Sequence, residues 1–328
     1  MRVLVGLVCA SVLGLASMAN AEPLNAKQVS AEAKWLVHID ADAMRSSVVV
    51  DKGYAKCAEK CKALGEKVTD LREACKIFDP TTDLQGLTFY GKEYKPGAGV
   101  AIVCGKLTET ILNGLSEGVQ KMPNYSVSTY NMYQLHTWTH AQGTKHERPI
   151  IGVYVQPNYL VFGASEAEVK AALDVLDGSK ANLAGTASPL AAAALPGALL
   201  LARVSGLADM KLPIESPIIK QTDAMALTLG ENNYEAYLTA DLAVKDVKTA
   251  DEVKAMVDGA LTNALMGTDD AEMSDLINAA RVSSTEKAVS VDVRGPADIG
   301  WTYLEKLAAK VAEEGRKQME KARQGQGK

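Results

Sequence analysis

The feature that most constrains this chain is a layout of strands and a helix that occurs twice. Residues 83–118 read DLQGLTFYGKEYKPGAGVAIVCGKLTETILNGLSEG, and a weaker copy of the layout returns over residues 223–259. Each copy begins with Asp and a short apolar strand, Leu87 to Tyr90 or Ala226 to Leu229, followed by a turn, a second strand and an amphipathic helix. The repetition predicts a duplicated fold and points to no reaction.

The two copies also continue in similar ways. The helices Leu107–Val119 and Ala250–Leu265 each carry one apolar stripe, which we expect to lie on a sheet. Short turns between successive strands favour antiparallel pairing. The predicted fold class is therefore α+β, with two pseudo-repeated halves that each form an antiparallel sheet covered by helices on one face. Further strands are predicted at Trp35–Met44, Leu200–Met210, Tyr125–Trp138, Ile150–Gln156, Tyr159–Gly163, Ala279–Ser284 and Ala288–Arg294, and closing helices at Glu166–Leu176 and Ala297–Val311.

A chain of 328 residues is long enough to form more than one hydrophobic core. Shifts in composition divide it into five parts. They are a signal peptide (1–21), a first α+β repeat (22–181) with an insertion at about 45–80, a linker (182–197), a second α+β repeat (198–312) and a charged flexible tail (313–328).

The first residues have the pattern of a secretory signal. Met1-Arg2 supplies a positive charge, Val3 to Leu15 is apolar, and Ala19-Asn20-Ala21 is an A-x-A cleavage site. The mature protein is expected to start near Glu22 in a periplasmic or secreted location, with no transmembrane segment after cleavage.

Four of the five cysteines lie beyond the predicted cleavage site: Cys57, Cys61, Cys75 and Cys104. An exported chain with an even number of cysteines is expected to form disulfide bonds, and the sequence leaves all three pairings open. Three of the four lie in the insertion, where two helices, Tyr54–Leu64 and Leu71–Phe78, are predicted. A small helical hairpin has little apolar area of its own, so a disulfide would stabilise it.

The charge pattern bears on the partner. The formal net charge is -5 with both signs interspersed, which argues against a nucleic-acid partner because phosphate binding needs a concentrated basic face. We expect instead a protein, peptide or saccharide ligand in the cell envelope. The sequence predicts no cofactor.

The stretches DLQGLTFYG followed by GVAIV, and NYLVFGASEAEVKAALDVLDG with a second copy, resemble secreted bacterial proteins that are built from a duplicated α+β unit and have no known activity. The resemblance covers most of the mature chain and implies the fold. The cysteine-bearing insertion departs from the simpler version of that family. The matching residues belong to the scaffold, so the resemblance implies no catalytic role for any of them.

Three histidines near a tryptophan form the best candidate for chemistry. His136, Trp138 and His140 would share one face of a strand, and His146 follows shortly after. They are candidate metal ligands, although no H-E-x-x-H motif is present. The alternative is a surface hairpin without a metal.

A second row, His38, Asp40 and Asp42, alternates along the first predicted strand. It would present paired carboxylates or bind a divalent metal, or else form a solvated sheet face.

Aromatic residues gather in the first half, where a shared open face would offer rigid contact area with polar tips. The candidate binding platform consists of Tyr125, Tyr130, Tyr133, Trp138, Tyr154 and Tyr159. The alternative is that strands favour aromatic residues in any protein.

Motifs of common hydrolases, nucleotide-binding loops and dinucleotide-binding loops are absent from the sequence. The sequence therefore favours an exported, non-enzymatic binding or scaffold protein. Two alternatives stay open: a metal-dependent hydrolase that uses His136, His140 and His146, and a carrier of an apolar small molecule in a cavity between helices and sheet.

Overall fold

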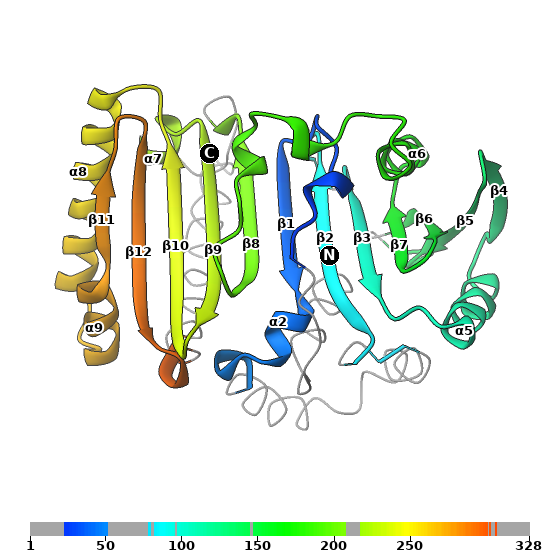
Figure 1. The fold of residues 1–328 in the computed structure, drawn as a ribbon, viewed down its shortest axis with the longest axis horizontal. Helices are drawn as coiled ribbons and strands as arrows, with labels where there is room; N and C mark the ends of the chain where they lie inside the picture. The colour runs from blue at the N-terminus through cyan, green and yellow to red at the C-terminus, as the bar shows by residue number, and fades with distance from the viewer. Residues whose placement is uncertain are drawn as a thin grey trace, which may run out of the picture.

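The computed structural model describes residues 23–51, 78–79, 82–95, 97–144, 147–207, 217–300, 302 and 306, and it arranges them around one large antiparallel sheet. The twelve described strands lie in the order β11-β12-β10-β9-β8-β1-β2-β3-β7-β6-β5-β4 (Figure 1). The strands are β1 (Trp35–Asp40), β2 (Leu84–Gly91), β3 (Val100–Gly105), β4 (Ser126–Tyr130), β5 (Tyr133–His140), β6 (Arg148–Val155), β7 (Tyr159–Gly163), β8 (Ala198–Ser205), β9 (Ala224–Asn232), β10 (Glu235–Ala243), β11 (Arg281–Ser284) and β12 (Ala288–Pro296).

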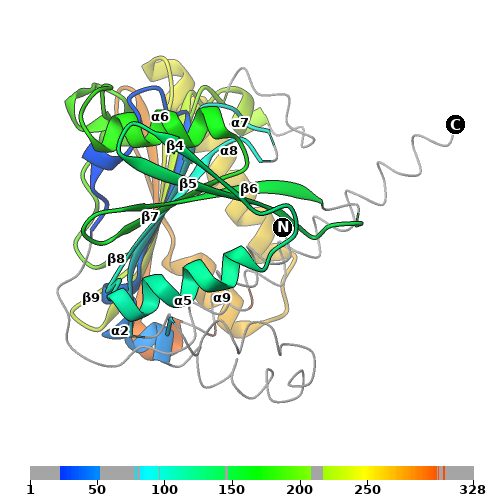
Figure 2. The same cartoon turned by 90° about the vertical axis from the view of Figure 1, so that its right-hand side faces the viewer.

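Helices flank this sheet on both faces. The α-helices are α2 (Ala41–Arg45), α5 (Glu109–Gln120), α6 (Glu166–Leu176), α7 (Pro217–Lys220), α8 (Val247–Met266) and α9 (Ala271–Ala279), and the 3-10 helices are η1 (Ala26–Gln28), η2 (Leu183–Gly185) and η3 (Pro189–Ala191). The prediction of antiparallel strands covered by helices is confirmed at this level. Strands β4 to β6 turn away from the direction of the central strands, as the right-handed twist of a wide sheet requires (Figure 2).

Near the centre of the sheet, the pair β1 and β8 joins strands from the two predicted halves. The pairing is antiparallel, with Trp35 opposite Val204 and Ile39 opposite Leu200. Beside this pair, the Tyr94 hydroxyl donates hydrogen bonds to the carbonyls of Lys34 (3.0 Å) and Ser205. The predicted halves therefore share one sheet, which the sequence did not indicate.

Alternation along the strands gives the sheet two unlike faces. The face that carries Leu36, Tyr90 and Ile102 is called the first face, and the opposite face, which carries Ile39 and Leu87, is called the second face. Over β1 to β7 the first face is apolar and packs against η1, α6, η2 and η3, with Leu36, Val161, Leu173, Leu183 and Leu190 all fully buried. This cluster is the larger core of the molecule.

Over β9 to β12 most apolar side chains lie on the second face instead, whereas β8 still contributes Leu201 to the core of the first face. On the second face, Leu242 and Val289 pack against Val253 and Val257 of α8. The first face of the same strands is polar, since Thr239 stands between Thr228 and Asp292 on the neighbouring strands. Each part of the sheet is thus covered on the face where its strands are apolar.

Side-chain caps fix where the helices begin. Thr108 accepts a hydrogen bond from the backbone N of Ile111 at the start of α5 (3.3 Å). Asp246 and Asp270 do the same for α8 and α9, with distances of 2.8 and 3.1 Å to the backbone N of Thr249 and Met273. Each cap satisfies a backbone donor that the helix itself leaves unpaired.

Three predicted strands, Trp35–Met44, Tyr125–Trp138 and Leu200–Met210, differ most from the structure, and the last of them is β8, which ends at Ser205. The first ends at Asp40 and not at Met44, because Asp40 caps α2 by accepting from the backbone N of Ala43 (2.7 Å). The run Tyr125–Trp138 is a hairpin of β4 and β5, broken at Asn131, which adopts a φ of 52°. Asn tolerates this left-handed conformation better than most residues, so the turn forms there.

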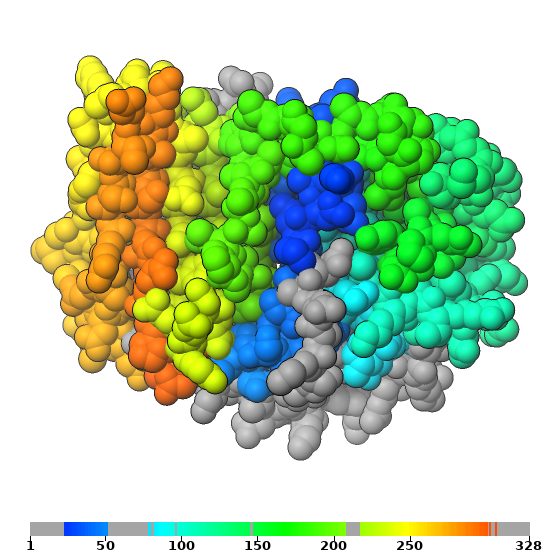
Figure 3. Space-filling model, in the orientation of Figure 1, coloured from blue at the N-terminus to red at the C-terminus, as the bar shows by residue number. Residues whose placement is uncertain are grey.

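The predicted linker 182–197 is packed against the sheet. Arg203 of β8, which is 5% exposed, donates hydrogen bonds to the carbonyls of Leu190 (2.7 Å), Ala192 and Ala193 (3.2 Å). In Figure 3 the green surface of this part of the chain runs along the top of the molecule. Leu183 and Leu190 of this segment therefore belong to the core of the first face, whereas residues 192–197 are exposed.

Other predictions fall on residues that the structure does not describe. They are the signal peptide, most of the insertion with Cys57, Cys61 and Cys75, and the tail; of the closing helix Ala297–Val311, residues 297–300, 302 and 306 are described and helical. In the described part of the chain, no helix is both long and apolar enough to pass through a bilayer.

Candidate functional site

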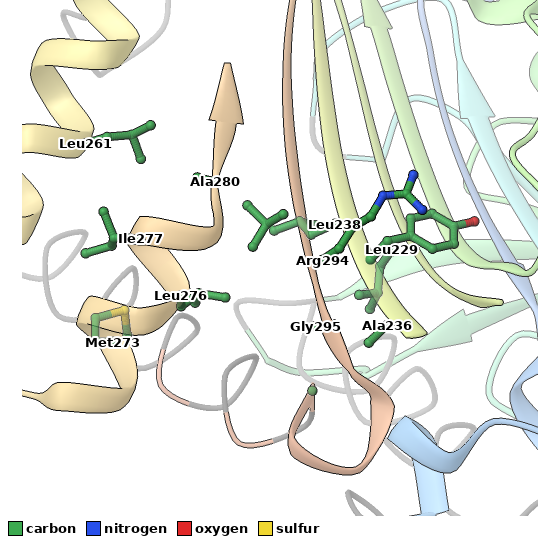
Figure 4. A pocket seen from close by; sticks show the side chains of 13 residues that line it. Leu229, Ala236, Leu238, Leu261, Met273, Leu276, Ile277, Ala280, Arg294 and Gly295 are labelled. Atoms are coloured by element: carbon green, nitrogen blue, oxygen red, sulfur yellow. The ribbon is translucent and has the colours of Figure 1, made fainter. Parts of the chain in front are cut away.

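An apolar cavity of about 180 Å³ lies between α8, α9 and the second face of the sheet. Its sheet wall is formed by Leu229, Leu238 and Val293, which are neighbours across β9, β10 and β12. Figure 4 shows Leu261 of α8 and the α9 side chains on the opposite wall. The cavity thus lies between a helix pair and three strands and is partly open to its surroundings.

The spacing of residues on α9 explains why this helix forms a wall. Met273, Leu276 and Ile277 recur at intervals of three and four along α9, so all three point to the sheet, and Ala280 follows directly after the helix. Two small residues of the lining, Ala236 and Gly300, approach each other closely. A Cβ on Gly300 would lie 2.9 Å from the Cβ of Ala236, so a larger side chain at position 300 would force the backbone apart.

Nearly all of the cavity lining is apolar, although Arg294 is among the lining residues. The Arg294 guanidinium bonds to Asp292 (2.9 Å) and Glu235 (3.2 Å) and lies 5.5 Å from the ring centroid of Tyr237. The hydrogen bonds to Asp292 and Glu235 raise the pKa of Arg294. Arg294 lies opposite Tyr237 and two residues from Asp292, so its guanidinium stands on the first face and points away from the cavity, which therefore offers no ion for a charged ligand.

The start of α9 is held by ion pairs to a residue near the end of the described chain. Lys306 lies 2.8 Å from Asp270 and 2.7 Å from Glu272. These hydrogen bonds raise the pKa of Lys306, and the bond from Lys306 lowers the pKa of Asp270. Both carboxylates also suit the positive end of the helix dipole.

A cavity of this size and chemistry can hold a small apolar molecule. An engineered apolar cavity of about 150 Å³ stays dry and accepts benzene or xenon. Water needs two to four polar partners, which an apolar lining does not supply. The apolar lining therefore suits a hydrocarbon group better than an ion.

The histidines that the sequence singled out lie at the other end of the sheet. Strand β5 places His136, Trp138 and His140 on one face, as predicted. The Tyr125 hydroxyl and His136 Nδ1 are 2.8 Å apart, and the two rings stack with centroids 6.0 Å apart. Burial lowers the pKa of His136, and burial together with the charge of Arg148 lowers that of His140.

His146 lies outside the described residues. Within the described residues, no three His, Cys, Asp or Glu side chains are grouped in a way that could hold a metal ion. The metal-dependent hydrolase therefore stays a prediction.

The row His38, Asp40 and Asp42 is buried, so the expectation of a solvated sheet face is wrong. His38 and Asp40 are 5% and 4% exposed on β1, and Asp42 is 3% exposed on α2. His38 Nδ1 is 2.9 Å from the hydroxyl of Thr88, Asp40 caps α2, and Asp42 forms an ion pair with Arg45. The carboxylates hold the local fold together, because buried charges need partners.

The six aromatic residues of the candidate platform are divided between the two faces. Tyr130, Tyr133 and Tyr159 pack against the core of the first face, and the Tyr130 hydroxyl donates to Asp174 (2.8 Å). Trp138 and Tyr154 belong to the second face, where Trp138 packs edge-on against Phe162. All six, including Tyr125, are half-buried. The structure does not bring them together on one surface.

The last sequence-predicted site is the cysteine set. Cys104 of β3 is 7% exposed, and its thiol lies 3.9 Å from Oε1 of Gln85. Its three predicted partners are outside the described residues, so the disulfides stay a prediction.

Sequence reasoning missed the residues of α9 that line the cavity. The signal was present, since Asp270 precedes the apolar spacing of Met273, Leu276 and Ile277. Helix α9 is short because β11 begins at Arg281, directly after it. The sequence analysis expected a single helix, Ala250–Leu265, before that strand and therefore missed α9.

The fold and the cavity define a class of protein: one wide antiparallel sheet, helices on both faces and an apolar space under a helix pair. No family model and no curated protein matches the chain.

Among solved structures, crystal form III of TP0453 is similar to this chain, with a TM-score of 0.49, 9% identity, and 88% of this chain and 99% of that chain covered. Crystal form I of TP0453 gives a TM-score of 0.46 with 10% identity, covering 88% of this chain and 98% of that chain. The likeness concerns the course of the chain, and no function follows from it.

Proposed function

We propose that this protein is an exported, non-enzymatic binding protein that carries an apolar small molecule in the cavity between α8, α9 and the sheet. The observation that carries the proposal is the cavity itself, with its apolar lining and its volume of about 180 Å³. An uncharged hydrocarbon group gains free energy on entering such a space, roughly in proportion to the apolar area removed from water. The secretory pattern at residues 1–21 supports a periplasmic or secreted location.

The proposal includes the architecture on which the site is built: two halves that are copies of one α+β unit. Outward from the centre, the first half reads β1-β2-β3-β7-β6 and the second reads β8-β9-β10-β12-β11, so corresponding strands occupy corresponding places. Helix α5 precedes the outer strands of the first half as α8 and α9 precede those of the second. On this proposal, the hairpin β4–β5 and a cysteine-bearing helical hairpin are additions to the first copy.

A small apolar probe tests the cavity. We expect benzene to bind the purified protein saturably, as measured by isothermal titration calorimetry. Ala280→Phe fills the cavity from the α9 side and is expected to weaken binding on the order of tenfold, because overpacking leaves no room for the probe.

The matched control is Ala279→Phe, since Ala279 is exposed and does not line the cavity. This variant is expected to bind like the unmodified protein. Equal binding by the two variants, or no saturable binding at all, contradicts the proposal.

The natural ligand is accessible by mass spectrometry. Protein purified from its own host and sprayed under native conditions is expected to carry an additional mass that organic solvent extracts. Ala280→Phe protein from the same host should lack this mass, whereas Ala279→Phe protein should retain it. A host-purified protein without bound mass speaks against carriage.

A further inference from the structure

The end of the sheet opposite the cavity is an open strand edge. Among the described strands, β4 pairs only with β5, and Figure 1 shows β4 as the outermost strand. Its side chains from Ser126 to Thr129 are exposed, and Val127 is 47% exposed. Such an edge leaves a row of backbone N–H and C=O groups available for another strand.

This edge lacks the usual protection against pairing. Proteins protect open edges with charged side chains, proline or bulges. Residues Met122 to Thr144, which contain the whole hairpin β4–β5, include no Asp, Glu, Lys or Arg, in a chain in which 23% of residues are charged. Strand β4 also has no proline and pairs with β5 in an unbroken register.

The opposite edge is different. Strand β11 has only four residues, begins with the exposed Arg281 and is contacted by α8. A short, charged and partly covered edge resists pairing with another chain. The contrast singles out β4 as the edge that is suited to association.

The hairpin turn determines which backbone groups point outward. A two-residue turn, Asn131-Met132, closes on the pair Tyr130 and Tyr133. In a hairpin of this kind the closing pair exchanges backbone hydrogen bonds, and alternate residues then do the same. Ser126, Ser128 and Tyr130 therefore bond to β5, while the N–H and C=O groups of Val127 and Thr129 point away from the sheet.

Charge and shape favour a second copy of the chain as the occupant. Two chains of net charge -5 repel each other over most of their surfaces, and identical uncharged edges are where they can meet without like charges in contact. A two-fold axis at Ser128 places Val127 opposite Thr129 of the second copy, a pair of β-branched residues of the kind that stabilises sheets. A peptide ligand would instead need side-chain pockets beside the edge, and the side chains of β4 stand exposed.

We propose that two copies of this chain associate through antiparallel pairing of their β4 strands, with Ser128 on the two-fold axis, so that the two sheets become one. The interface is isologous, and Val127 and Thr129 of each copy exchange backbone hydrogen bonds with Thr129 and Val127 of the other. The two cavities then lie at the far ends of the joined sheet.

Sedimentation equilibrium of the full chain tests the association. The unmodified protein is expected to be a reversible dimer whose population rises with concentration. Ser128→Lys sets two ammonium groups face to face on the axis and is expected to weaken the dimer about tenfold or more. Its matched control, Ser283→Lys on the exposed part of β11, is expected to leave the dimer unchanged.

A second variant tests the backbone contacts. Thr129→Pro removes an outward N–H that β5 does not use, and proline is tolerated on edge strands in this way. By symmetry it removes two hydrogen bonds, so a loss of affinity on the order of tenfold is expected, whereas Thr129→Val should retain the dimer.

Cross-linking gives a readout that does not depend on affinity. Ser128→Cys is expected to form a covalent dimer under oxidation, with peptide mapping locating the bond between the two introduced sulfurs. A monomer at all concentrations, a dimer that Ser128→Lys does not weaken, or a covalent dimer joined only through the chain's own cysteines each overturns the proposal. So does an unmodified monomer that binds an extended peptide along β4.

Discussion

The two parts of the sheet are covered on opposite faces and to different degrees. Over β1 to β7 the larger apolar cluster lies on the first face, where Leu36, Leu173 and Leu183 are fully buried, and a smaller one with Ile39 and Leu87 lies on the second face. Over β9 to β12 most apolar side chains point to the second face, where α8 and α9 leave a cavity of about 180 Å³. On the proposed function, the first part supplies stability and the second part supplies the space for the ligand.

The largest expected effect is a difference in how much a leucine-to-alanine change in each region lowers the free energy of unfolding. Leu36→Ala removes a fully buried side chain from the dense core, so we expect it to lower the free energy of unfolding by about 3 kcal/mol. Leu238→Ala removes a half-buried side chain that already borders empty space, and a loss of about 1 kcal/mol is expected. Urea unfolding followed by circular dichroism measures both.

Equal losses in the two variants would break the contrast. They would mean that a bound molecule packs against Leu238, since a filled cavity makes its lining as sensitive as a dense core. Repeating the measurement after solvent extraction of the protein separates the two cases. The cost of Leu238→Ala should not change on extraction if the cavity is empty from the start.

A smaller effect is expected where the segment 182–197 closes the first face. Arg203→Met removes the hydrogen bonds to the carbonyls of Leu190, Ala192 and Ala193, so we expect a loss of about 2 kcal/mol in the free energy of unfolding. Arg281→Met, at an exposed position of β11, is the control and should change it by less than about 0.5 kcal/mol. A similar small change in both variants would show that the segment is held by its apolar contacts alone.

The smallest expected effect is a pH dependence of the free energy of unfolding, which we attribute to histidines of the first half. All four histidines lie in the first half, and burial lowers the pKa of His136 from its usual value of 6.5. The unfolded chain therefore binds more protons than the folded protein just below pH 6.5, so stability falls as the pH drops through this value and levels off below the folded pKa. At neutral pH and above, this contribution is constant.

Urea unfolding at a series of pH values between about 5.5 and 8 measures this slope around the histidine pKa. His136→Gln is expected to reduce the slope, and a further His140→Gln should reduce it more, because the pKa of His140 is also lowered. An unchanged slope in the double variant would assign the pH dependence to groups other than His136 and His140 and contradict this prediction.

Local patterns predicted individual elements well. Helix α6 has the predicted bounds, Glu166–Leu176, and β7 has the predicted bounds, Tyr159–Gly163, because each has a clear period and a clear stop. Helix α8 extends the predicted Ala250–Leu265 to Val247–Met266, since Asp246 caps it earlier than the apolar stripe begins.

Non-local choices could not be predicted in the same way. The pairing of β1 with β8 depends on strands that are far apart in sequence, and nothing in either strand specifies the other. The row His38, Asp40 and Asp42 looked solvated because alternation gives the period of a strand and not which face is covered. The sequence suggested a cavity between helices and sheet but not its lining residues, because the lining depends on how α9 packs against three strands.

The central position of β1 has a consequence for how the protein reaches its fold. One neighbour of β1 is β2, but the other is β8, which is made only after the whole first half. Until β8 emerges, one edge of β1 is exposed, and long-range pairings of this kind form slowly. During synthesis, a strand that lies inside the finished sheet therefore has an unpaired edge until the second half is available. Unpaired edges of this kind favour aggregation, so the protein depends on rapid pairing of β8 with β1.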